Sequence, residues 1–179
     1  IMCKSKYSNI IDKAIFPGIQ GGPFMNMIAA KAVAYQEAST DDFKIYAKKV
    51  VSNSKRLSEV ISSNGFRIVS GGTDNHQFTI DLSKNGLTGN TIASLLRNAG
   101  IIVNKNGIPY DDLPPKITSG IRIGTPALTS RGMGLEEMSI LGKLIVDIIN
   151  SKKDSKTLEK LSGEVRELAS AFKIPGVDY

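Results

Sequence analysis

The chain has 179 residues, which suits one medium-sized domain, or one small domain with an attached arm. Its 41% hydrophobic content supports a buried core, and no apolar run approaches the ~18 residues that a membrane span requires. The formal charge is +6, but the 23 basic residues are scattered and aromatic residues make up only 6% of the chain. These features disfavour a nucleic-acid-binding surface and favour a solvated basic surface or small anionic ligands.

The single cysteine, Cys3, excludes an internal disulfide and favours a reducing compartment. No signal-peptide pattern is present, so we expect a cytoplasmic protein. Ile1-Met2-Cys3 has the character of a buried strand, so we expect the natural product to continue upstream of Ile1. The only histidine, His76, is expected to be structural rather than a general base. It has no Cys or carboxylate partners at ligand spacing, so no metal site is predicted.

The N-terminal third predicts two helices separated by a polar cluster. Residues 24–38 contain strong helix formers and no Gly or Pro. The cluster at 39–42 offers capping side chains for a second helix, which Asn64-Gly65 ends. Its predicted apolar stripe comprises Phe43, Ala47, Val50, Leu57 and Ile61. We place a boundary at the polar cluster, between an N-terminal arm, 1–40, and a small domain, 41–179.

The remainder predicts short strands, one helix between them and a helical cover. Strands are expected at 66–69, 78–82, 101–103 and 120–124. A helix is expected from Thr88 to Gly100, and a turn-rich loop from Asn104 to Pro115. Two apolar stripes predict the C-terminal helices: Leu135, Met138, Leu141, Leu144, Ile145 and Ile148, then Leu158, Leu161, Val165, Leu168 and Phe172. The predicted fold class is therefore α/β, with a helical arm.

A glycine-rich loop precedes the first long helix. The stretch FPGIQGGP, residues 16–23, holds three glycines and two prolines. Glycines can turn backbone N–H groups toward one point, and a helix start adds partial positive charge, so the loop suits a phosphate. From spacing alone, a loop that merely turns the chain is the more frequent case.

Two further stretches have side chains suited to binding. In SGIRIG, strand alternation points Ile121 and Ile123 to one face and Arg122 to the other, with flanking glycines leaving space for a ligand. A guanidinium matches a carboxylate with two hydrogen bonds, although an arginine on a wet strand face is more frequent. The asparagines of NKNGIP suit a heterocyclic edge, but ordinary turn chemistry explains the same residues.

Read together, these stretches resemble serine hydroxymethyltransferases. FPGIQGGP, MIAAKAVAYQEA, SGGTDNHQFTIDL, NKNGIP and SGIRIGTPALTSRG match in the family's order, over about residues 14–137. The resemblance implies the C-terminal part of a fold-type I, pyridoxal-phosphate-dependent transferase. Residues 1–40 would end the large domain, and 41–179 would form the small α/β domain with an antiparallel sheet. It further implies one-carbon metabolism and amino-acid biosynthesis, in which serine and tetrahydrofolate interconvert with glycine and 5,10-methylenetetrahydrofolate.

The resemblance also implies roles for single residues. Gly21 and Gly22 would contact the cofactor phosphate of the neighbouring subunit, in a homodimer or a tetramer. Arg122 would bind the carboxylate of serine or glycine, and Asn106 the pterin of tetrahydrofolate. The family usually has a Ser-Pro-Phe-like triplet in contact with folate, where this chain reads Pro114-Pro115-Lys116. Asn26 replaces a histidine that is common in the family.

The family's Schiff-base lysine lies in a Thr-His-Lys motif that is expected upstream of Ile1. No catalytic residue is therefore expected within these 179 residues. We predict that the chain alone is inactive and that activity requires a companion N-terminal chain. One alternative is a non-catalytic remnant, or a protein that acts on an intact homologue through the dimer surface. The other is a basic nucleic-acid-binding module, which the scattered charges disfavour.

Overall fold

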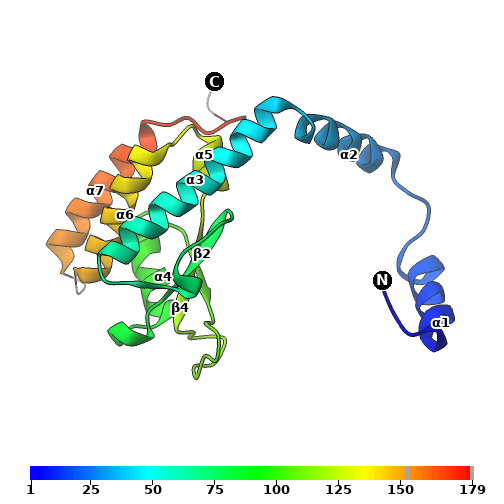
Figure 1. Ribbon diagram of the computed structural model, residues 1–179, viewed down its shortest axis with the longest axis horizontal. Coiled ribbons are helices and arrows are strands. Elements are labelled where there is room, and N and C mark those ends of the chain that lie inside the picture. The colour runs from blue at the N-terminus through cyan, green and yellow to red at the C-terminus, as the bar shows by residue number, and fades with distance from the viewer. Residues whose placement is uncertain (152–153, 178–179) are drawn as a thin grey trace. The chain divides into compact units, whose positions relative to one another are not determined.

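The computed structural model describes residues 1–151 and 154–177, and it divides into two compact units, Ile1–Lys44 and Ile45–Tyr179 (Figure 1). The first unit contains α1 (Ser8–Lys13) and α2 (Met25–Ala38), neither of which has a buried residue. Helix α2 confirms the helix predicted at 24–38.

The strand expected at Ile1–Cys3 is wrong. These three residues have no regular structure, and the side chain of Ile1 is 92% exposed. A strand requires hydrogen bonds from a neighbour, and the described part of the first unit contains no strand.

Helix α3 (Asp41–Ser63) follows the polar cluster, as predicted. The Thr40 hydroxyl accepts a hydrogen bond from the Phe43 amide at 3.3 Å, and Gly65 leaves the helix end at φ +91°. The C-terminal half of the predicted stripe is in the core, with Leu57 and Ile61 fully buried. Phe43 is 43% exposed, so the predicted apolar stripe is wrong at the N-terminal end of α3.

Four strands form one antiparallel sheet in the order β1-β2-β4-β3. They are β1 (Arg67–Ile68), β2 (Gln77–Asp81), β3 (Asn104–Asn106) and β4 (Gly120–Gly124). Phe78 pairs with Ile123, and Ile80 with Ile121, so β2 and β4 present one continuous apolar face.

The strand predicted at 101–103 is wrong, because the pairing begins three residues later. The Ile101 amide donates to the Leu96 carbonyl at 2.8 Å, which ties this segment to the end of the preceding helix. The chain reaches β4 only at Asn104, which pairs with Arg122. Ile102, predicted within a strand, is 84% exposed.

Four further α-helices lie in the described part of the second unit: α4 (Gly89–Asn98), α5 (Pro126–Ser130), α6 (Leu135–Asn150) and α7 (Ser155–Ser170). The Thr88 hydroxyl caps α4 by accepting from the Thr91 amide at 3.4 Å, and the Asp154 carboxylate caps α7. Figure 1 shows α6 and α7 side by side, and the two helices are in contact. The predicted C-terminal helices are confirmed, although Leu135 is 53% exposed and lies outside the core.

The core lies between the apolar face of the sheet and the helices. Helices α3 and α6 approach closely at Gly142, where an added Cβ would lie 2.9 Å from the Cβ of Val60. Helices on one side of a sheet leave its other face free, and that face carries polar residues. The result confirms the predicted α/β class with an antiparallel sheet. No helix among the described residues is both long enough and apolar enough to span a membrane.

Candidate functional site

The polar face of the sheet positions the arginine that the sequence analysis singled out. Arg122 occupies the middle of β4, paired with Thr79 of β2 on one side and Asn104 of β3 on the other. Its neighbours Ile121 and Ile123 are buried against the helices, while Arg122 is exposed. The predicted alternation along β4 is therefore confirmed, and a rigid inner strand fixes the backbone of Arg122.

The guanidinium of Arg122 is available to a ligand. Arg67 pairs with Asp81, and Arg131 donates to the Phe172 carbonyl at 2.7 Å. Among the described residues, no hydrogen bond or ion pair engages the side chain of Arg122. An exposed guanidinium without an internal acceptor can form two parallel hydrogen bonds with a carboxylate.

The space beside Gly120 is not open to a ligand, contrary to the prediction. A Cβ at Gly120 would lie 2.7 Å from the Ile80 carbonyl oxygen and 3.0 Å from Cγ2 of Ile108. The position is buried, and Ile108 fills the volume that the missing side chain leaves. At Gly124, by contrast, an added Cβ would meet only ordinary contacts of 3.4 Å or more. Gly120 therefore serves close packing of the sheet.

Asn106 lies on the same face of the sheet as Arg122. It pairs with Gly120, and Asn104 pairs with Arg122, so both asparagines share that face by strand alternation. The Asn106 amide nitrogen donates to the carbonyl of Gly107 at 2.7 Å, which leaves its carbonyl oxygen for other donors. The structure thus places Arg122 and Asn106 on one polar surface.

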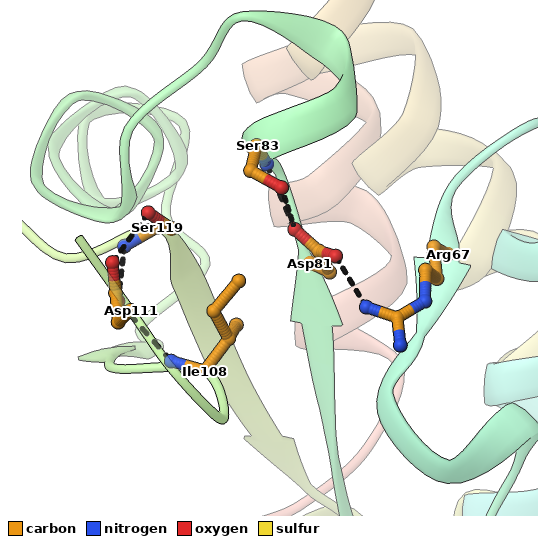
Figure 2. Close-up of polar contacts among 6 residues, drawn as sticks. All are labelled: Arg67, Asp81, Ser83, Ile108, Asp111 and Ser119. Atoms are coloured by element: carbon orange, nitrogen blue, oxygen red, sulfur yellow. Dashed lines mark hydrogen bonds and ion pairs between the residues drawn. The ribbon is translucent and has the colours of Figure 1, made fainter. Parts of the chain in front are cut away.

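A carboxylate, Asp111, organises the segment that joins β3 to β4 (Figure 2). Its Oδ1 accepts from the Leu113 amide at 3.0 Å and from the Ser119 hydroxyl at 2.6 Å. Its Oδ2 accepts from the amides of Ile108 at 3.1 Å and Ser119 at 2.9 Å. The Ser119 hydroxyl, followed by the backbone amides, lowers the pKa of Asp111 from its ordinary 3.8 to about 2.

Pro114, Pro115 and Lys116 lie in this segment and are exposed. The Pro114 carbonyl accepts from the amide of Ile117 at 2.8 Å, and the Lys116 carbonyl accepts from Lys105 Nζ at 2.9 Å. Lys105 points to the face opposite Asn106 by alternation, so these contacts hold the segment at the edge of the sheet.

Sequence reasoning also missed a buried carboxylate contact on the sheet, the ion pair between Asp81 and Arg67. Asp81 is 2% exposed, and it accepts hydrogen bonds from Arg67 and from the hydroxyl and amide of Ser83 (Figure 2). Burial raises the pKa of Asp81, but the hydrogen bonds from Ser83 and Arg67 outweigh it and the net pKa is lowered. The sequence signal that could have revealed this pair was the alternation of β2, which places Asp81 on the polar face of the sheet.

Gly21 and Gly22 belong to the first unit, in an exposed stretch before α2. A Cβ at either position would meet nothing within 4 Å, so open space adjoins both backbones. Helix α2 begins after Phe24, which provides no capping side chain, so its first amides have no side-chain acceptor. Open backbone beside an uncapped helix start suits a phosphate in chemistry and in space.

The remaining candidates are His76 and Cys3, and no hydrogen bond or ion pair joins either side chain to another residue that the structure describes. His76 is exposed, and its backbone carbonyl accepts from the Thr125 amide at 3.0 Å. Cys3 is exposed. No group of three or more His, Cys, Asp or Glu side chains among the described residues is arranged to hold a metal ion.

The depressed pKa of Asp111 predicts a specific pH dependence. Because its folded pKa of about 2 lies below 3.8, its stabilisation is complete above pH ~5 and is lost as the pH falls toward 2. Asp111→Asn removes this titration. The difference in free energy of unfolding between parent and variant should be constant above about pH 5 and shrink below pH 4.

Urea unfolding followed by circular dichroism at a series of pH values measures this difference. Asp112→Asn alters the adjacent, exposed carboxylate, whose side chain makes no hydrogen bond to a described residue. This control should follow the parent at every pH. A constant gap between parent and Asp111→Asn down to pH ~2 would contradict the prediction.

Comparison with known proteins agrees with this architecture. Residues 2–145 match the family described as serine hydroxymethyltransferase. The chain is 49% identical over 174 residues to a curated serine hydroxymethyltransferase of Methanospirillum hungatei JF-1. That alignment covers 97% of this chain but 42% of the relative, so the chain spans about two fifths of the relative's length. The chain therefore belongs to the serine hydroxymethyltransferase family, of which it is a partial member.

Proposed function

We propose that this chain forms the C-terminal part of an enzyme that interconverts serine plus tetrahydrofolate with glycine plus 5,10-methylenetetrahydrofolate. The observation that carries the proposal is the exposed guanidinium of Arg122, which shares a polar sheet face with Asn106 and has no partner among the described residues. Two substrates of different chemistry can meet on such a face, one through its carboxylate and one through its heterocycle.

Arg122 anchors the carboxylate of serine or glycine. A bidentate contact fixes two points of the amino acid, so the bonds at Cα take one defined orientation. Strand β4 is suited to this task because β2 pairs with all five of its residues, and Ile121 and Ile123 are locked in the core. The backbone of Arg122 is therefore held in a fixed position, whereas the backbone of a loop residue can move.

Gly21, Gly22 and the first amides of α2 hold the phosphate of pyridoxal phosphate from a neighbouring subunit. When bound, the cofactor supplies an electron sink for the bond broken at Cα. Its phosphate requires backbone donors, which open glycines and an uncapped helix start provide. This arrangement requires a homodimer or a tetramer. The single cysteine fits a reducing cytoplasm.

Asn106 contacts the pterin of tetrahydrofolate, and residues 114–116 border the same cosubstrate. Pro114 stands where the family has a hydroxyl and Lys116 where it has an aromatic ring, so residues 114–116 offer an ammonium group and no aromatic ring. The glutamate part of folate is anionic, and Lys116 supplies a matching charge.

The isolated chain is inactive in this proposal, because the cofactor-binding lysine belongs to a companion N-terminal chain. The second candidate is a non-catalytic remnant that binds an intact homologue. It is favoured by α2, which has no buried residue and leaves large apolar side chains uncovered, such as Val33 at 60% and Tyr35 at 72% exposed.

The test is co-expression of this chain with the N-terminal remainder of a serine hydroxymethyltransferase, followed by Arg122→Lys. The parent assembly should gain activity that neither part has alone. Arg122→Lys should raise the Kd for serine and glycine by about tenfold to a hundredfold, since an ammonium cannot reproduce the bidentate fork. Arg97→Lys, at an exposed position on α4, is the matched control and should leave both constants unchanged.

Equal amino-acid binding by the parent and Arg122→Lys would remove the assigned role of Arg122. Activity of the isolated chain would refute the need for a companion. An assembly that forms but stays inactive would favour the remnant over the enzyme.

A further inference from the structure

The segment between β3 and β4, residues 107–119, is long for an ordered connection without regular structure. Its tip is solvated, with Tyr110 fully exposed. Tyr110 and Thr118 both have φ of 59°, a left-handed conformation that non-glycine residues adopt only when their surroundings hold them there. Contacts within the chain must therefore impose this conformation.

Asp111 provides contacts on either side of both residues, at Ile108, Leu113 and Ser119, and it uses its whole acceptor capacity to do so. A carboxylate offers about four lone-pair sites, and four donors occupy them, at distances from 2.6 to 3.1 Å. No site remains for a substrate, a metal ion or a reacting proton. Asp111 therefore acts on function only through the residues that it holds.

The four donors come from two different parts of the unit. Ile108 and Leu113 lie in the exposed part of the 107–119 segment, whereas Ser119 is its last residue, is buried and immediately precedes β4. The Ser119 carbonyl also accepts from the Leu82 amide at 2.9 Å, so Ser119 is fixed from the β2 side as well. Asp111 thus ties a solvated loop to a rigid point of the sheet (Figure 2).

A hydrophobic contact reinforces this tie. The Cγ2 of Ile108 lies 3.0 Å from where a Cβ of Gly120 would be, so its side chain covers the glycine directly. Ile108 follows Asn106 by two residues, and Gly120 precedes Arg122 by two. The contact joins the strand end bearing Asn106 to the strand bearing Arg122.

We propose that Asp111 is the positioning residue for folate, holding Asn106 and the 107–119 segment at a fixed place relative to the carboxylate anchor Arg122. The inference rests on the proposed function and deepens it. Strand β4 keeps its own position through β2 and the core, so loss of Asp111 loosens the 107–119 segment beside Asn106 and leaves β4 in place. The amino-acid side of the site stays intact.

The substitution Asp111→Asn tests this because it keeps the size of the side chain. In the variant an NH2 group replaces one carboxylate oxygen, and an NH2 group cannot accept a hydrogen bond. Each oxygen of Asp111 accepts from at least one backbone amide, so at least one backbone hydrogen bond is lost. Asp112→Asn is the matched control. Hydrogen exchange of the full chain should show the amides of Ile108, Leu113 and Ser119 exchanging about tenfold faster or more in Asp111→Asn and unchanged in Asp112→Asn.

The functional measurement uses the assembly with the N-terminal remainder, with 5-formyltetrahydrofolate and glycine as separate probes. Asp111→Asn should raise the Kd for the folate about tenfold and leave the Kd for glycine within about twofold. A role in stability alone would move both constants together. The split between the two ligands therefore identifies positioning.

Unchanged amide exchange in Asp111→Asn would overturn the inference, as would equal losses of folate and glycine binding. Failure of the unaltered assembly to bind 5-formyltetrahydrofolate would instead overturn the folate part of the proposed function. The two failures are distinguishable because exchange is measured without ligand. Faster exchange together with a selective folate defect supports the inference.

Discussion

Gly120→Ala is expected to lower the free energy of unfolding of the second unit by about 3 kcal/mol. The added Cβ would lie 2.7 Å from the Ile80 carbonyl oxygen and 3.0 Å from that of Asn106, so backbone must move on both sides of β4. These oxygens belong to strands that pair with β4, and neither is the end of a flexible side chain. Urea unfolding followed by circular dichroism measures the loss.

Gly124→Ala is the matched control, on the same strand and the same face. Its Cβ would meet the His76 carbonyl oxygen at 3.4 Å and Gln77 Cβ at 3.7 Å, which are ordinary contacts. The expected change is within about 0.5 kcal/mol. Equal effects at Gly120 and Gly124 would show that the sheet tolerates the methyl group and would contradict this prediction.

Leu57→Ala should cost about 2 to 5 kcal/mol of stability. Leu57 is fully buried on α3, and its Cδ1 lies 3.4 Å from where a Cβ of Gly142 would be. The close approach of α3 and α6 leaves little freedom for neighbours to fill the cavity. Thermal and urea unfolding of the chain give the magnitude.

Ile45→Ala removes an aliphatic side chain of the same helix at a position that is 53% exposed. It should change stability by about 0.5 kcal/mol or less, since little apolar surface is withdrawn from water there. A loss at Leu57 no larger than at Ile45 would mean that α3 does not pack in solution as described.

Much of the fold was predictable because its elements have strong periodic signals. The alternation of Ile121, Arg122 and Ile123 predicted which face of β4 is buried, and the long helices were found from their apolar stripes. Prediction failed at 101–103, where three apolar residues have strand propensity but no partner. Pairing is set by register with β4, and the local sequence does not contain that register.

Single residues of the candidate site could be predicted from the sequence, but the contacts between them could not. Arg122 and Asn106 were found from the sequence, but only the register shows that they share a face. Asp111 lies within the turn-rich loop predicted from Asn104 to Pro115, and its signal was limited to an Asp after Pro-Tyr. Its bonds to Ser119, eight residues away, depend on how the segment folds back. The space beside Gly120 was misjudged because the residue that fills it, Ile108, comes from another strand end.

The sheet edges described above bear on self-association of the chain. The outer strands, β1 and β3, have only 2 and 3 residues; β3 carries the cation Lys105, and Arg67 of β1 is paired with Asp81. Long, flat and uncharged edges are templates for pairing with a second molecule, whereas short edges with positive charge resist it. Beyond Arg122, β4 exposes a short edge on the β3 side, and Pro126 follows it closely. The sheet therefore presents little template for strand-to-strand aggregation, although its core strands are apolar.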